Sequence, residues 1–166
     1  MIDLHRLVRL RRFSREAVPK PAGKPVRTME PVKLVAITEG PAESQALQRI
    51  ADSYTWAISI VASSDAAIAA LGEPPTALVI CDRDLVTEDW RDVLTRIASL
   101  PQAVCSLLAS RVVDDYLWRQ VIRHHGYDVV SKPFQPEELR RAVSFAWSWR
   151  GWAHRHYSEA PGKPSA

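Results

Sequence analysis

Two carboxylates follow an unbroken run of five apolar residues. The run ALVIC at 77–81 leads directly into Asp82, Arg83 and Asp84. A continuous apolar run of this length, rich in β-branched residues, is typical of a strand that is buried on both faces of a parallel sheet. Ligands of open α/β sheets bind just beyond the carboxyl ends of the strands. Asp82 is therefore placed where chemistry is expected, although the same residues would also suit the start of a polar loop.

Three further apolar runs end in side chains that could join Asp82. They are followed by Glu39, Ser110 and Lys132. Parallel strands bring their carboxyl ends to one edge of a sheet, so these groups are expected to converge on one crevice. A carboxylate can accept a phosphoryl group as a nucleophile or hold Mg²⁺. Lysine and hydroxyl groups can stabilise phosphoryl oxygens, so the set favours phosphoryl chemistry.

The elements that would position these residues alternate between strand and helix. The predicted strands cover residues 32–37, 56–61, 77–81, 103–109 and 127–130. The predicted helices cover 41–53, 65–71, 88–99 and 114–124, and a last helix begins at Pro136. Either Ser63 or Ser64 suits the N-cap of the second helix, and Thr87 suits that of the third. This alternation predicts an α/β fold, a doubly wound five-stranded parallel sheet with helices on both faces.

The basic charge of the chain belongs to its ends. The 166 residues carry 22 Lys and Arg against 19 Asp and Glu, a net charge of +3. Residues 1–31 hold 8 and 3 of these, or +5, and residues 149–166 hold 3 and 1, or +2. The remaining 11 and 15, or −4, fall in residues 32–148, where no basic stripe for nucleic acid is found. We therefore expect a disordered basic, Pro-rich tail over 1–31, a folded domain over 32–148, and a helical extension followed by a disordered tail over 149–166.

Several classes of protein are disfavoured by what the chain contains. Cys81 and Cys105 both lie in apolar runs, so we interpret them as core residues and not as a disulfide or a metal pair. No apolar stretch has the length of a membrane span, and no signal peptide opens the chain, so the expected location is the cytoplasm. Met29, just before the first strand, is an alternative start for translation.

Residues 32–147 resemble the receiver domains of response regulators in two-component signalling. The match is carried by GYDVVSKPFQPEEL at 126–139, which contains the Lys-Pro-Phe of that family, and by LVICDRDL at 78–85. The resemblance implies the flavodoxin-like fold with strand order 2-1-3-4-5. It also implies that Asp82 is the phosphoacceptor and that Lys132 pairs with the phosphate.

The remaining site residues are also carried over from the resemblance. Glu39 matches the second of the paired acidic residues that hold Mg²⁺, and the backbone carbonyl of Asp84 would be a further ligand besides Asp82. Ser110 matches the switch hydroxyl, with Ala109 as the alternative if the alignment shifts by one residue. A sensor histidine kinase or a phosphotransfer protein would then supply the phosphoryl group.

Three positions depart from the family pattern. Thr38 stands where the first of the paired acids is expected, so Mg²⁺ should bind weakly. Val129 replaces the aromatic switch residue, and strand alternation would place Tyr127 on the same face as a partial substitute. Val86 stands where a proline is common. These departures leave open a degenerate receiver that binds partners without phosphorylation.

The chain is too short after residue 148 for an output domain, so a stand-alone receiver that signals by protein–protein contact is expected, and not an enzyme. The partner face would lie on helix 114–124, the strand after it and the last helix, with Trp118 and Trp147 as anchors, and a homodimer could use it. A remote alternative is a haloacid-dehalogenase-type phosphatase, because residues 82–86 fit its DxDx[TV] loop. That family, however, carries this loop on its first strand.

Overall fold

A computed structural model describes residues 31–72, 78–101 and 104–157, with side chains as far as residue 149. Its strands are β1 (Lys33–Ile37), β2 (Ala57–Val61), β3 (Leu78–Asp82), β4 (Ser106–Ser110) and β5 (Asp128–Ser131). Its helices are α2 (Pro41–Ser53), α3 (Ser64–Leu71), α4 (Trp90–Ala98), α5 (Asp115–Arg123) and α6 (Pro136–Tyr157). The basic tail predicted over 1–31 lies outside the described residues except for Pro31, and so does Met29.

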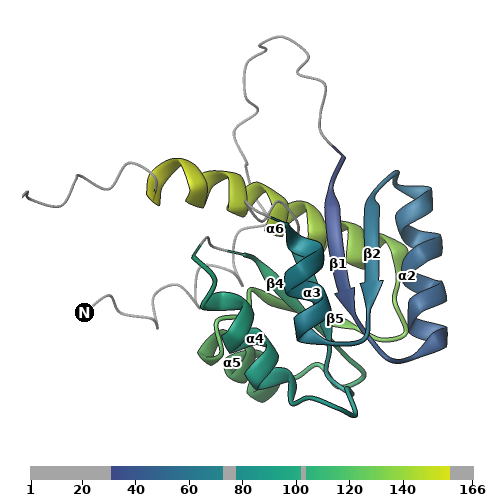
Figure 1. The fold of residues 1–166 in the computed structure, drawn as a ribbon. Coiled ribbons are helices and arrows are strands. Elements are labelled where there is room, and N and C mark those ends of the chain that lie inside the picture. Colours follow the sequence, from purple (N-terminus) through teal and green to yellow (C-terminus); the bar gives the residue numbers. More distant parts are fainter. Residues whose placement is uncertain (1–30, 73–77, 102–103, 158–166) are drawn as a thin grey trace, which may run out of the picture. The chain divides into compact units, whose positions relative to one another are not determined.

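The strands form one five-stranded sheet in the order β2-β1-β3-β4-β5, and every pairing is parallel. This is the predicted flavodoxin-like, doubly wound topology. Strand β3 lies at the centre because two strands flank it on each side. Strands β1 and β2 point to the lower edge of the view in Figure 1, which is the carboxyl edge of the sheet.

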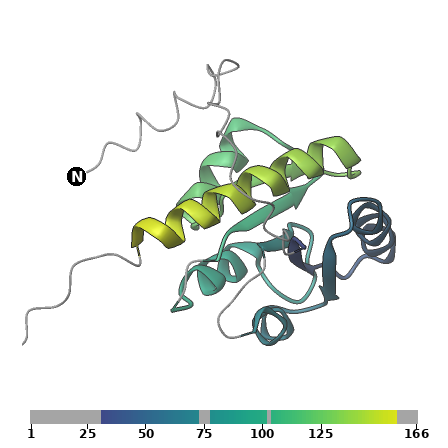
Figure 2. The same cartoon turned by 90° about the horizontal axis from the view of Figure 1, so that it is seen from above.

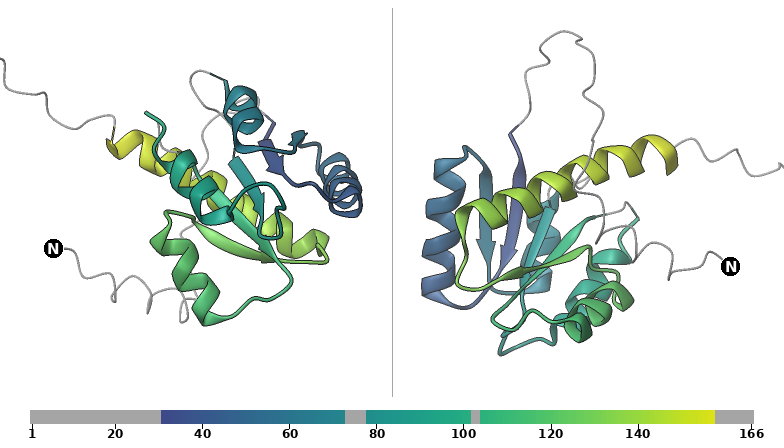
Figure 3. Two further views of the ribbon diagram at one scale, coloured as in Figure 1. Left: turned by 60° about the horizontal axis from the view of Figure 1, so that its bottom comes forward. Right: turned by 180° about the vertical axis from the view of Figure 1, so that it is seen from behind.

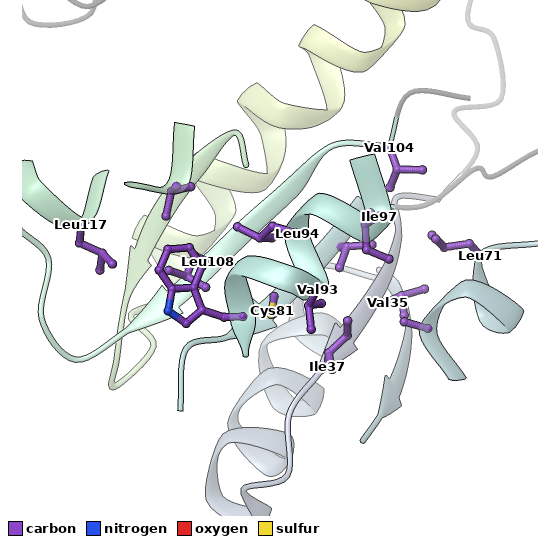
Figure 4. Packing of buried hydrophobic residues seen from close by; sticks show 14 residues of the cluster. Val35, Ile37, Leu71, Cys81, Val93, Leu94, Ile97, Val104, Leu108 and Leu117 are labelled. Carbon is purple, nitrogen blue, oxygen red and sulfur yellow. The ribbon is translucent and has the colours of Figure 1, made fainter. Parts of the chain in front are cut away.

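Helices cover both faces of this sheet. Helices α3, α4 and α5 pack on one face and bury a cluster that includes Val35, Val79 and Leu108 of the strands; we call it the α3–α4–α5 cluster, and Figure 4 shows its side chains. Helices α2 and α6 pack on the other face over alternate strand residues such as Leu34, the α2–α6 cluster. The view from behind in Figure 3 shows α6 crossing the sheet beside α2, and Figure 2 shows the same helix from above. Alternate side chains of each strand are thus buried in two separate cores, one on each face of the sheet.

Several boundaries differ from the predicted ones. Helix α4 begins at Trp90, and Asp89 caps it by accepting from the amide of Arg91, so the predicted start at 88 with Thr87 as the cap is wrong. Strand β3 includes Asp82 as its last residue, one position later than predicted. Strand β4 starts at Ser106, not at 103. The predicted cap of α3 at Ser63 is confirmed, since its side chain accepts from the amide of Ala66.

The last helix is long. Helix α6 runs unbroken from Pro136 to Tyr157 and so passes through the expected domain boundary at 148. Its first half is anchored by Leu139, Val143 and Ala146, which are fully buried in the α2–α6 cluster. The helical extension predicted after residue 148 is therefore a continuation of this helix. None of the helices in the described ranges is both long and apolar enough to cross a membrane.

Candidate functional site

Asp82 lies at the carboxyl end of the central strand with its side chain almost fully buried. Lys132 Nζ lies 2.5 Å from Asp82 Oδ1, and the amide of Asp84 donates to the same oxygen at 2.9 Å. The hydroxyl of Thr38 donates to Asp82 Oδ2 at 3.1 Å. Both carboxylate oxygens are therefore bonded, which is what a buried charge requires.

Lys132 follows strand β5 and is as buried as Asp82, with 7% of its surface exposed. The peptide bond to Pro133 is cis. Besides Asp82, the lysine Nζ lies 3.0 Å from Asp84 Oδ2 and 3.8 Å from Glu43 Oε1. The sheet thus brings together Asp82, Asp84 and Lys132, as the sequence predicts, although 48 to 50 residues separate the carboxylates from the lysine.

Two residues that the sequence did not single out complete the charged group. Glu43, in the first turn of α2, and Arg111, directly after β4, form an ion pair with 3.3 Å between Nη2 and Oε1. The other guanidinium nitrogen lies 3.3 Å from Asp84 Oδ2. Arg111 directly follows Ser110 in the sequence, and Glu43 lies four residues after Glu39, in the first turn of α2.

The hydroxyl of Ser110 bonds to its own loop. It donates to the carbonyl of Val112 at 2.7 Å, and it accepts from the Val112 amide and from Arg83 Nη1. Its contacts among the described residues do not include Asp82. Ala109, the alternative switch position, pairs with Asp82 in the β3–β4 ladder but is buried in the α2–α6 cluster. Ser110 is therefore the residue of the two that carries a hydroxyl at this strand end.

The carboxylate of Glu39 is bonded to the loop after β3. Its carboxylate accepts from the amides of Val86 and Thr87 at 3.0 and 3.3 Å and from the Thr87 hydroxyl at 2.6 Å. These bonds, led by that of the Thr87 hydroxyl, hold the pKa of Glu39 below its ordinary value of 4.5. Glu39 thus joins the β1–α2 loop to the β3–α4 loop.

The Asp84 carboxyl is stabilised as an anion by the cations around it. The hydrogen bond from Lys132 lowers its pKa below the ordinary value of 3.8, and the charges of Lys132, Arg111 and Arg83 add to this effect, while partial burial opposes it. At neutral pH Asp84 is therefore an ionised partner of two cations. Such a group is poorly suited to donate a proton as a general acid.

The acidic residues are not arranged as a metal site. Within the ranges that the structure describes, no group of three or more His, Cys, Asp or Glu side chains is placed to hold a metal ion. The ammonium of Lys132 donates to the carboxylates of Asp82 and Asp84, and amides of the β3–α4 loop donate to the carboxylate of Glu39. In this arrangement the carboxylates of Asp82 and Glu39 are both engaged by protein donors, and Mg²⁺ binding stays a prediction.

The expected substitute for the aromatic switch is not formed. Val129 packs against the α3–α4–α5 cluster, as its place in β5 requires. Tyr127 precedes the strand, packs against the α2–α6 cluster and stacks at a tilt on Trp149 with 5.6 Å between ring centroids. The expectation that Tyr127 shares a face with Val129 is therefore wrong, because strand alternation does not extend to a residue outside the strand.

The two predicted anchor tryptophans lie on helices that flank the edge strand β5. Trp118 of α5 is half-buried, and its indole nitrogen donates to Asp128 Oδ1 at 3.3 Å. Trp147 of α6 packs against the α2–α6 cluster. The large apolar side chains that are exposed on the same two helices include Tyr116, Phe145 and Trp149.

No protein-family profile and no curated protein sequence matches the chain. Solved structures do match it. The signal receiver domain of an HD-domain protein from Pseudomonas fluorescens has a TM-score of 0.67 at 19% identity, covering 84% of this chain and 98% of that one. The chemotaxis response regulator CheY4 of Vibrio cholerae has a TM-score of 0.64 at 13% identity, covering 70% and 99%.

A third match is a receiver domain seen in a complex. The receiver domain of the Saccharomyces cerevisiae response regulator Ssk1, in a co-crystal structure with the histidine phosphotransfer protein Ypd1, has a TM-score of 0.63 at 11% identity, covering 72% of this chain and 91% of that one. The strand order, the helices on both faces and these neighbours agree. Residues 31–157 have the fold of CheY-like response-regulator receiver domains.

Proposed function

We propose that the protein is a receiver that accepts a phosphoryl group on Asp82 and signals by contacts with other proteins. The observation that carries the proposal is the ion pair of Asp82 and Lys132 at the carboxyl end of β3, with 2.5 Å between the charged atoms. A carboxylate held beside a buried ammonium is suited to become an acyl phosphate, because the cation remains to balance the added negative charge.

In the proposed step, an oxygen of Asp82 attacks the phosphorus of a phosphohistidine. An O–P bond forms and the N–P bond breaks, with its electron pair left on the imidazole, which takes a proton from water. The donor is a sensor histidine kinase or a phosphotransfer protein. The complex of the Ssk1 receiver with Ypd1 supports a donor of the second kind for a domain of this fold.

The proposed receiver signals by binding another protein. The helices that flank β5 offer Trp118 and Trp147 to a downstream protein or to a second copy of this chain. We propose no direct contact with nucleic acid, and a cytoplasmic location. Weak binding of Mg²⁺ by Asp82, the Asp84 carbonyl and Glu39 belongs to the proposal only if Glu39 leaves the Val86 and Thr87 amides.

A second candidate function is a receiver that binds partners without phosphorylation. It is favoured by Thr38, which offers a hydroxyl where an acid is expected, and by the engagement of Glu39 elsewhere. The phosphatase alternative is disfavoured, because that family carries its DxDx[TV] loop on the first strand, whereas residues 82–86 follow the third strand here.

The proposal is tested by treating the full chain with phosphoramidate, a small phosphoryl donor, and measuring the intact mass. We expect one added phosphoryl group, released by hydroxylamine, in the native protein and in the control Asp92→Asn, which removes an exposed carboxylate from α4. We expect none in Asp82→Asn. Labelling that persists in Asp82→Asn would move the acceptor elsewhere, and no labelling of the native protein under any condition would favour the phosphorylation-independent function.

A further inference from the structure

The guanidinium of Arg111 and the ammonium of Lys132 share the same two carboxylates. Asp84 Oδ2 lies 3.0 Å from Lys132 Nζ and 3.3 Å from Arg111 Nη1. Glu43 Oε1 lies 3.8 Å from Lys132 Nζ and 3.3 Å from Arg111 Nη2. The four side chains form a closed ring of alternating charge, and Lys132 connects this ring directly to Asp82.

The side chains of the ring differ in how far they are exposed to solvent. The side chain of Lys132 is 3% exposed, whereas that of Arg111 is 67% exposed. An ion pair that is open to water adds little to stability, since solvent screens it and both side chains lose freedom. Arg111 is therefore free to exchange Asp84 or Glu43 for another anion without disturbing the fold.

Phosphorylation of Asp82 would add negative charge beside the Asp84 carboxylate and would increase the need for cations at this site. Three carboxylates, from Asp82, Asp84 and Glu43, lie beside the cations of Lys132 and Arg111, and Arg83 lies nearby on the Ser110 hydroxyl. Converting the carboxylate to an acyl phosphate adds about one more negative charge. Thr38 contributes a neutral hydroxyl, and Glu39 is bound to the β3–α4 loop, so the acids that would attract a divalent cation are not assembled.

Arginine has the geometry that this task requires. A guanidinium presents two parallel N–H groups that match two oxygens of a phosphate, and it remains charged at any physiological pH. Arg111 already donates from both terminal nitrogens, from Nη1 to Asp84 and from Nη2 to Glu43. Arg83, the other nearby cation, donates to Ser110, so it is committed to the turn after β4.

We propose that Arg111 binds the phosphoryl group on Asp82 and supplies positive charge there that a divalent cation would otherwise supply. The proposal rests on the proposed phosphorylation of Asp82. Upon phosphorylation, the guanidinium leaves one of its two carboxylates and donates to the phosphoryl oxygens, while Lys132 stays on the oxygen that it already contacts. Phosphorylation of this receiver then proceeds without Mg²⁺.

The test uses the full chain, phosphoramidate as the donor, and the rate of labelling measured by intact mass with Mg²⁺ and with EDTA. The variants are Arg111→Ala and Arg111→Lys, of which the second keeps the charge but loses the two parallel N–H groups. The control is Arg119→Ala, which removes an exposed arginine from α5. We expect the native protein and the control to be labelled at similar rates in both conditions. Arg111→Ala should lose about tenfold or more in EDTA, with Arg111→Lys in between. Circular dichroism establishes that each variant is folded.

The outcomes separate this proposal from the proposed function. Labelling of Asp82 that needs Mg²⁺ in the native protein and is equal in Arg111→Ala would overturn the role of Arg111 while leaving the acceptor in place. A complete lack of labelling in the native protein, with and without Mg²⁺, would overturn the proposed function and this inference with it.

Discussion

At the scale of single residues, the site depends on a buried ion pair. Asp82 and Lys132 are 6% and 7% exposed, and each finds its charge partner in the other. Removing two ions from water costs more than their attraction returns unless further hydrogen bonds complete the pair. Thr38 and the Asp84 amide provide those bonds on the Asp82 side. These bonds compensate for the burial of the Asp82 charge.

Breaking this pair from one side should destabilise the protein. In Lys132→Met the Asp82 charge stays buried without its cation, and we expect the free energy of unfolding to fall by about 3–5 kcal/mol at pH 7. The double variant Asp82→Asn/Lys132→Met should recover most of this loss, because no buried charge remains. Urea unfolding measures both. Arg111→Ala serves as the control and should cost less than about 1 kcal/mol, since its ion pairs are open to water. An equally large loss in the double variant would contradict the explanation.

At the scale of elements, two glutamates hold the loop between β3 and α4. Glu39 reaches it from the end of β1 and bonds the Val86 and Thr87 amides. Glu88, within the loop, accepts from the amide and hydroxyl of Ser64 and so satisfies the amino end of α3. The segment that follows the acceptor is thus tied to its neighbours on both sides. The same contacts explain why α4 starts only at Trp90.

The tether from Glu39 should respond to acid. The folded pKa of Glu39 is below its ordinary value of 4.5, so its contribution is complete above that pH and is lost as the pH falls through the lowered value. We expect hydrogen-exchange protection of the Val86 and Thr87 amides to decline in that range. In Glu39→Ala both amides should be weakly protected at every pH. The control Glu137→Ala, which removes an exposed carboxylate from α6, should behave like the native protein. Protection in Glu39→Ala that equals the native value would show that the tether has no role.

At the scale of the whole domain, the sheet separates two cores that share its strands. Leu94 of α4 is fully buried in the α3–α4–α5 cluster, and Leu139 of α6 is nearly so in the α2–α6 cluster. Every strand contributes side chains to both clusters, because successive strand residues point to opposite faces of the sheet. Because the strands are common to both cores, the domain is expected to unfold in a single transition.

Truncation of either core should show this coupling. Leu94→Ala and Leu139→Ala should each lower the free energy of unfolding by about 2–5 kcal/mol. Because the two side chains lie on opposite faces, the losses should add in the double variant within about 0.5 kcal/mol. Val86→Ala, at a position that is 87% exposed, is the control and should have little effect. Two separate unfolding steps by fluorescence and circular dichroism would contradict a shared cooperative unit.

The local sequence pattern was sufficient to predict the bounds of α2 and the N-cap of α3. The bounds of α2 were predicted fully, and the cap of α3 at Ser63 was among the two expected. The sequence pattern was less reliable at segments where long-range partners decide. Thr87 has the chemistry of an N-cap, but it bonds to Glu39 across 48 residues instead. Tyr127 is two residues before Val129, as expected for two strand residues on the same face, but it lies before the strand begins.

The alternation of strands and helices in the sequence predicted a parallel sheet with Asp82 and Lys132 at the same edge, and the resemblance to receiver domains implied the strand order. Only the tertiary structure decided where the other charges lie. Glu39 turns to the β3–α4 loop, while Glu43 and Arg111 close a ring over Asp84. The physical reason is that a strand's direction is set by backbone pairing over many residues. The partner of an exposed or half-buried side chain, in contrast, is set by loops whose conformation depends on the whole assembled edge of the sheet.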